Sequence, residues 1–243
     1  MKILAGCPVR NRAWCLAEHL LAMEDNRSKN WGGETYYLVN DSVDATAATL
    51  RVSFLRPDYD IFNTDDPGWT RTGAEGPRRN EANMALVFNE WMKRSLSFEY
   101  DYLWLVSSDV MPGPNTLSLL LENADEKTLV GAVCLNSVGG SQNWMYHDAC
   151  SDCYYRPDVT PPDWCYILEY SPFEVGMIGS PVLIPRAAVE SGAQHTDHPQ
   201  SHICGWYDGL RERGFKVLAD PRPRVEHWLD MDTKLIWEGN GAN

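Results

Sequence analysis

The chain has 243 residues, of which 44% are hydrophobic and 23% charged, a composition typical of packed globular proteins and incompatible with wholesale disorder. No stretch approaches the roughly 18 consecutive apolar residues that a transmembrane helix needs, so we expect no membrane span. The formal net charge of −13 disfavours non-specific binding to nucleic acids or anionic membranes. An anionic ligand would therefore need a local basic site or a bound metal.

The cysteine content indicates a reducing compartment. Seven cysteines are an odd number and do not suit a complete disulfide framework. The apolar run before Cys7 is also shorter than the roughly 7–15 residues of a signal peptide. We therefore expect a cytoplasmic protein.

Apolar runs alternate with helical patterns over the first two-thirds of the chain, which predicts βα units and a largely parallel sheet. The predicted strands cover residues 2–8, 35–39, 59–63, 102–106 and 129–135. The predicted helices cover residues 12–23 after the cap Asn11, a short segment after the cap Asp44, residues 80–96 and residues 115–122. Because residues 102–106 are continuously apolar, we expect a central strand that is buried on both faces.

Beyond this region the pattern changes. Residues 136–172 show no periodicity and are rich in Gly, Pro, Cys and aromatic residues, which is typical of a functional cover or insertion. Order returns with a predicted strand over 176–184, a helix over 203–213 and a strand over 216–219, followed by a polar tail. No linker or internal repeat divides the chain, so we expect a single domain.

Polar side chains follow three predicted strands. Asp109 comes after the central strand, Asp41 after the second strand and Arg10 after the first. Because ligands of open α/β sheets bind at the carboxyl ends of the strands, these residues are candidates for one site. The alternative is turn chemistry. We interpret Asp44 as a helix cap and Arg12 as a solvated residue of the first helical turn.

The order of several motifs resembles that of nucleotide-sugar-dependent glycosyltransferases of the GT-A fold, of the broad kind that includes glycosyltransferase family 2. The resemblance covers about residues 1–136 and 174–228. Its motifs are Pro8 and Asn11 after the first strand, the acidic segment 39–44, Arg78-Arg79-Asn80 before the long helix, Ser107-Ser108-Asp109 in place of an Asp-any-Asp motif, the glycine-rich segment 175–179, and residues 210–221 followed by His227.

The resemblance implies a single-domain GT-A fold, a Rossmann-like α/β architecture with a mostly parallel sheet flanked by helices and an irregular insertion. Residues 1–136 would form the nucleotide-binding half, 137–172 the insertion, and 173–243 the half that completes the acceptor and metal sites. The implied activity is metal-assisted transfer of a sugar from a UDP- or GDP-sugar to an acceptor hydroxyl.

The resemblance also assigns roles to residues. A diphosphate leaving group gains charge as the glycosidic bond breaks, which suits Mn²⁺ or Mg²⁺ held by oxygen and imidazole ligands. Asp109 and His227 are the implied metal ligands, although Ser107 replaces the first acid of the motif. The implied donor-binding residues are Pro8, Arg10, Asn11, Asp41, Arg79, Ser107 and Gly179.

The catalytic base is the clearest departure from the family pattern. Inverting members carry Glu-Asp just before the closing helix, and an ungapped alignment places His202 and Ile203 there. Asp208 is the nearest carboxylate and our first candidate for the general base. Glu174 and His202 remain alternatives, so the sequence leaves inversion or retention open.

Further alternatives concern the insertion, the acceptor and the activity itself. His147, Cys150, Cys153 and Cys165 could bind a structural zinc or could be reduced, packed side chains. The acceptor could be a glycan, a lipid-linked sugar, a small metabolite, a protein side chain or, against the net charge, a modified base in DNA. The rival functions are a non-catalytic nucleotide- or sugar-binding module and a nucleotidyltransferase.

Overall fold

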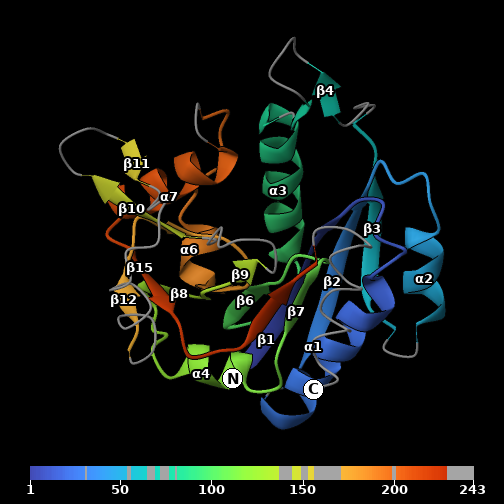
Figure 1. Ribbon diagram of the computed structural model, residues 1–243, viewed down its shortest axis with the longest axis horizontal. Coiled ribbons are helices and arrows are strands. Elements are labelled where there is room, and N and C mark those ends of the chain that lie inside the picture. The colour runs from blue at the N-terminus through green and yellow to red at the C-terminus, as the bar shows by residue number, and fades with distance from the viewer. Residues whose placement is uncertain are drawn as a thin grey trace.

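The computed structural model describes residues 1–30, 32–53, 56–64, 69–71, 77–79, 81–136, 144–148, 153–155, 171–198 and 201–228. An eight-stranded sheet crosses the molecule, with helices on both of its faces (Figure 1). The order of its strands is β12 (Phe173–Glu174), β15 (Lys216–Asp220), β8 (Thr128–Ala132), β14 (Val182–Pro185), β6 (Tyr102–Leu105), β1 (Lys2–Val9), β2 (Gly32–Asn40) and β3 (Asp58–Phe62).

Most neighbours in this sheet run parallel. The pairs β6–β1, β1–β2, β2–β3 and β15–β8 are parallel, whereas β14 is antiparallel to both of its neighbours and β12 is antiparallel to β15. The predicted α/β fold with a mostly parallel sheet is confirmed. The prediction of a central β6 is also confirmed, because it lies between β14 and β1.

Two helical layers cover the sheet. Helices α3 (Glu81–Ser95), α6 (Arg186–Glu190) and α7 (His202–Glu212) lie on one face, where Trp91, Leu103 and Tyr207 belong to one buried cluster. Helices α1 (Leu16–Asn30) and α4 (Thr116–Leu121) lie on the other face, where Trp104 and Leu117 belong to a second cluster. Helix α2 (Thr46–Val52) packs beside α1. None of the helices described is both long and apolar enough to cross a membrane.

Smaller sheets surround this core. Strands β7 (Val110–Pro112), β16 (Val225–His227) and β9 (Leu135–Asn136) form one of them. Strands β11 (Cys153–Tyr155), β10 (Trp144–Asp148) and β13 (Met177–Ile178) form another, and β4 (Trp69–Arg71) pairs with β5 (Pro77–Arg79). The expectation that 136–172 is wholly irregular is therefore wrong, since β10 and β11 lie within it.

Three predicted element boundaries are also wrong. Helix α1 begins at Leu16 rather than residue 12, because Asn11 has a left-handed backbone (φ 50°) and its side chain binds Val43 instead of capping α1. The predicted strand 176–184 is divided into β13 and β14 by a segment with a cis Ser180–Pro181 peptide bond. The predicted strand 129–135 likewise becomes β8 and the separate β9.

Candidate functional site

The candidate site lies where the neighbouring strands β6, β1 and β2 end. Parallel strands have their carboxyl ends at the same edge of a sheet, so the loops that follow these three strands meet there. The loop after β6 carries Asp109, the loop after β1 carries Arg12, and the loop after β2 carries Asp41. The structure thus places three charged residues that are far apart in the sequence at one edge of the sheet.

Asp109 is the central acid of this site. The residue is 8% exposed, and its carbonyl oxygen accepts the N–H of Trp228 at 2.8 Å. Its two carboxylate oxygens face different partners: Oδ1 lies 3.8 Å from His227 Nε2, whereas Oδ2 lies 3.0 Å from Arg12 Nη2. Burial raises the pKa of Asp109, but the nearby His227 and Arg12 outweigh this effect and lower it to about 2. Asp109 is therefore ionised at neutral pH.

The pairing of two short strands positions His227. In the antiparallel pair β7–β16, His227 is opposite Val110, the residue directly after Asp109. This register places the imidazole beside the Asp109 carboxylate. His227 is the last residue of β16 and follows β15, which corresponds to the predicted strand 216–219.

Arg12 is the residue that sequence reasoning missed. Its interpretation as a solvated residue is wrong, because the guanidinium binds Asp109 and the side chain is only 28% exposed. Its backbone N–H donates to Thr46 Oγ1 at 2.8 Å, which holds the loop after β1 against α2. The sequence did contain a signal for this ion pair. A basic residue follows β1, and position 107, where the Asp-any-Asp motif has its first acid, is a serine.

Hydrogen bonds join the loops after β1 and β2. Asn11 donates its backbone N–H to Ser42 Oγ at 3.1 Å and accepts the N–H of Val43 at Oδ1. The Asp44 carboxylate accepts the N–H groups of Ala13, at 3.1 Å, and of Thr46, at 2.9 Å. Asp44 therefore binds the first residue of α2, as expected of a cap, and also anchors the loop that carries Arg12.

Asp41 lies in the site but has local partners. Its Oδ1 accepts the backbone N–H of Thr64 at 2.8 Å, and its Oδ2 accepts the Thr64 hydroxyl. Asp41 therefore holds the segment after β3 against the end of β2. A nucleotide that uses this carboxylate would have to share it with Thr64.

The other predicted donor-binding residues occupy the same edge or lie outside the described residues. Pro8 is in β1 opposite Leu38, beyond the last residue of β1 that pairs with β6. Ser107 donates its N–H to Ser180 Oγ at 2.6 Å, which places Gly179 next to the loop of Asp109. Arg10 directly follows β1. The backbone of Arg79 belongs to β5, but its side chain lies outside the described residues.

The three candidates for the base have different surroundings. Asp208 lies on α7 in an ion pair with Arg211, 3.8 Å from His198 Nε2, and its side chain is 37% exposed. Glu174 lies on β12, and β15, β8 and β14 separate this edge strand from β6. His202 begins α7, and its side chain is only 4% exposed.

His202 belongs to a buried cluster between α3 and α7. Its Nδ1 lies 2.7 Å from Glu81 Oε2, and the same oxygen accepts the His202 backbone N–H at 2.9 Å. Phe88 and His195 pack against its ring, with centroid distances of 5.1 and 5.3 Å. His202 Nε2 is buried and makes no hydrogen bond with any described residue. This arrangement ties the first turns of the two helices together.

Asp109 and His227 lie close enough to converge on one divalent cation. No group of three or more His, Cys, Asp or Glu side chains suited to a metal occurs among the described residues. Adjacent ligands about 2.1 Å from an octahedral cation lie about 3.0 Å apart, so Asp109 Oδ1 and His227 Nε2, now 3.8 Å apart, would move slightly closer to share one. Mg²⁺ usually combines one or two carboxylates with water and substrate phosphates. The side chains of the predicted zinc ligands, His147, Cys150, Cys153 and Cys165, lie outside the described residues, so that site stays a prediction.

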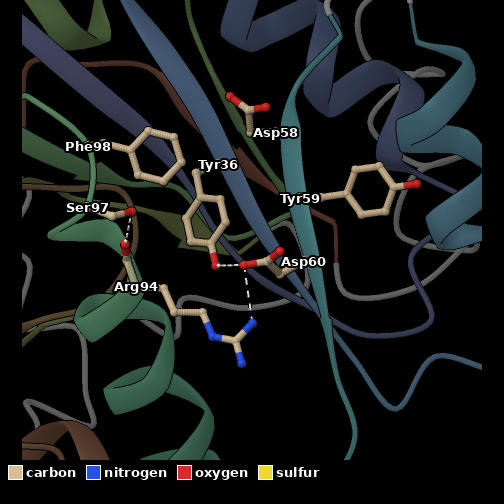
Figure 2. A pocket seen from close by; sticks show the side chains of 7 residues that line it. All are labelled: Tyr36, Asp58, Tyr59, Asp60, Arg94, Ser97 and Phe98. Atoms are coloured by element: carbon tan, nitrogen blue, oxygen red, sulfur yellow. Dashed lines mark hydrogen bonds and ion pairs between the residues drawn. The ribbon is translucent and has the colours of Figure 1, made fainter.

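A separate cavity of about 280 Å³ lies near the C-terminal end of α3 and the beginning of β3. Within it, Tyr36 Oη and Arg94 Nη1 lie 3.0 and 3.2 Å from Asp60 Oδ2. Figure 2 shows these three side chains together. The cavity residues come from β2, from the amino-terminal part of β3, and from the end of α3 and the segment just after it, not from the loop that carries Asp109. This cavity is therefore distinct from the candidate site.

Comparison with known proteins identifies the fold. No family model matches the chain, and no curated protein sequence matches it either. Among solved structures, it is similar to S. aureus TarS 1-349 in complex with UDP-GlcNAc, with a TM-score of 0.62 and 11% identity over 95% of this chain and 59% of that one. It is also similar to GalNAc-T7 with UDP, GalNAc and Mn²⁺, with a TM-score of 0.64 and 12% identity over 96% of this chain and 45% of that one.

The chain thus spans about half the length of these structures, and they align with nearly all of it. At this identity the likeness establishes the fold and not the activity. It agrees with the mixed sheet and its two helical layers. The chain has the fold of GT-A glycosyltransferases.

Proposed function

We propose that this protein is a glycosyltransferase that moves a sugar from a UDP- or GDP-sugar to an acceptor hydroxyl, assisted by Mn²⁺ or Mg²⁺. The observation that carries the proposal is the cluster of Asp109, Arg12 and His227 at the carboxyl ends of β6 and β1. In a chain with a net charge of −13, Arg12 and a metal ion held by Asp109 and His227 would provide the local positive charge that an anionic nucleotide requires.

The residues of the site have separable roles in the proposed reaction. Asp109 Oδ1 and His227 Nε2 would hold the cation, which would neutralise charge on the departing diphosphate. The loops that Asn11 and Asp44 tie together would hold the nucleotide. Ser107 and Gly179 lie beside Asp109 and would contact the donor.

Asp208 is the proposed general base. Helix α7 packs against β13, because Tyr207 Oη donates to the carbonyl of Ile178 at 2.6 Å, and Ser180 just beyond β13 binds Ser107. This chain of contacts connects α7 with the loop of Asp109. The Asp208 side chain is far more exposed than that of His202 and can accept a proton from an acceptor hydroxyl as its oxygen attacks the anomeric carbon.

Binding of nucleoside diphosphates is the first test of this function. In Mn²⁺, UDP or GDP at about 100 times its Kd should stabilise the fold by about 2.7 kcal/mol, because it binds only the folded state. For a protein of this size, the melting temperature should rise by roughly 5–10 °C. Differential scanning fluorimetry with UDP, GDP and their sugars measures the shift. The proposal fails if none of them changes the melting temperature.

The proposed metal site makes a second prediction. Asp109→Asn removes the ligand charge and should weaken Mn²⁺ binding by at least about 10-fold, as even loss of an outer partner of a metal site costs about 10- to 100-fold. Electron paramagnetic resonance of free Mn²⁺ measures the affinity. Asp60→Asn is the matched control, because Asp60 also pairs with an arginine but lies in the separate cavity. Equal Mn²⁺ affinity of Asp109→Asn and wild type would contradict the metal assignment.

The rate at which UDP or GDP is released from a sugar nucleotide distinguishes an enzyme from a protein that only binds the donor. A glycosyltransferase usually transfers some sugar to water, whereas a non-catalytic binding module does not. The acceptor class and the cytoplasmic location stay predictions, as does the division of the chain into the segments 1–136, 137–172 and 173–243.

A further inference from the structure

We propose that Arg12 is a permanent cation of the donor site, which binds the donor diphosphate and allows nucleoside diphosphates to bind without a divalent metal. This inference rests on the proposed function but concerns a residue outside the motifs that suggested it. It follows from the charges of the site and from the positions of the two Asp109 oxygens.

The charges of the site balance before any metal binds. Two acids of an Asp-any-Asp motif carry two negative charges, which a divalent cation cancels. Here Ser107 removes one of those charges, and the guanidinium of Arg12 cancels the charge of Asp109. Arginine stays protonated throughout the accessible pH range. A diphosphate therefore meets a neutral site rather than an uncompensated carboxylate.

The geometry lets Arg12 act alongside a metal. Arg12 Nη2 faces Asp109 Oδ2 at 3.0 Å, whereas His227 Nε2 faces Oδ1 at 3.8 Å. Metal binding at Oδ1 therefore need not displace the arginine from Oδ2. Guanidinium has five N–H donors, so one Asp109 contact leaves others for phosphate oxygens.

The local structure holds Arg12 at this position while leaving it reachable. Its backbone N–H donates to Thr46, and its carbonyl accepts the N–H of Leu16 at 2.9 Å, at the start of α1. Arg12 Nη1 contacts the Arg10 carbonyl at 3.4 Å. With 28% of its side chain exposed, Arg12 is anchored but not enclosed.

Calorimetric titration with UDP and with GDP, in EDTA and in Mn²⁺, tests the proposal. Wild type should bind at least one of them in EDTA. Arg12→Gln should raise its Kd in EDTA about 10- to 100-fold, the effect of losing a charge-assisted hydrogen bond. Mn²⁺ should restore most of the lost affinity, because it supplies positive charge beside the same phosphates.

Three controls separate charge from structure. Uridine or guanosine lacks the diphosphate and should bind wild type and Arg12→Gln equally. Arg94→Gln removes another arginine that is paired with an aspartate, 3.2 Å from Asp60 in the cavity of Figure 2, and should leave all affinities unchanged. Arg12→Lys keeps the charge and should bind more tightly than Arg12→Gln in EDTA. If Arg12→Gln does not fold, Arg12→Met replaces it, because methionine also removes the charge but keeps an unbranched side chain.

Three results would overturn the inference. In the first, wild type binds UDP and GDP only when Mn²⁺ is present, and the proposed function survives. In the second, Arg12→Gln binds UDP and GDP in EDTA as tightly as wild type, or its affinity for the nucleosides falls as much as its affinity for the diphosphates. Arg12 then has only a structural role. In the third, neither diphosphate binds wild type in either condition, and the proposed function fails as well.

Discussion

Asp208→Asn is expected to lower turnover by about 10²–10⁴-fold, the usual contribution of a positioned general base. The amide cannot accept the proton that the attacking oxygen must lose, whereas its size hardly differs from that of the carboxylate. Donor affinity should change little, because Asp208 lies on α7 and not among the loops that carry Asp109 and Arg12. The measurement is the rate of UDP or GDP release from the sugar nucleotide that gives the largest thermal shift.

Matched variants of the other candidates make this test selective. Glu174→Gln should retain near-wild-type turnover, because Glu174 lies on the edge strand β12. His202→Gln should lower the melting temperature, because it disturbs the buried contact between His202 and Glu81. A folded Asp208→Asn enzyme with wild-type turnover would refute the assignment. His202 or Glu174 would then be the base if its variant folds but turns over slowly.

The main elements could be predicted from the sequence because their signals are local. Apolar residues recur at helical spacing in α3, and β6 is continuously apolar, because both elements bury side chains in the core. Each of these patterns lies within its own segment and can be read without knowing the neighbouring elements. The ends of these elements were less predictable. Asparagine is a common helix cap, but the side chain of Asn11 accepts the N–H of Val43, 32 residues away in the sequence. Helix α1 therefore begins later, at Leu16.

The partner of Asp109 could not be read from any window of sequence. Arg12 and Asp109 are 97 residues apart and meet only because β1 and β6 are neighbours in the sheet. Taken alone, an arginine in the first turn before a helix is typically solvated. The sequence indicated this ion pair only through two features taken together, the basic residue after β1 and the serine in place of an acid at position 107.

The same limit applies to His202. Its position before the closing helix suggested a catalytic residue, but the sequence did not show that Glu81 lies against it across 121 residues. Phe88 and His195 then enclose the ring. Tertiary packing therefore decides whether such a histidine faces a substrate or joins two helices, and here it joins α3 to α7.

Gly6→Ala is expected to destabilise the fold by about 4 kcal/mol or more, a size reserved for severe steric or backbone conflicts. Gly6 has φ +147°, and a Cβ built there would lie 2.0 Å from the carbonyl oxygen of Tyr36 in β2. That oxygen also accepts the indole N–H of Trp91 at 3.2 Å, so relief of the clash would disturb α3 as well. The backbone of β1 cannot shift easily, because the Gly6 carbonyl accepts the N–H of Val106.

Gly214→Ala is the matched control for this substitution. Gly214 also has a positive φ, +79°, but a Cβ there would meet nothing within 4 Å, so only the left-handed backbone cost of about 1–2 kcal/mol applies. Urea midpoints of the two variants and wild type measure the difference. Equal midpoints for Gly6→Ala and Gly214→Ala would show that β1 and β2 can separate at Tyr36. A clearly lower midpoint for Gly6→Ala than for Gly214→Ala, or loss of soluble protein for Gly6→Ala alone, would show that the fold requires the close approach of β1 and β2 at Gly6.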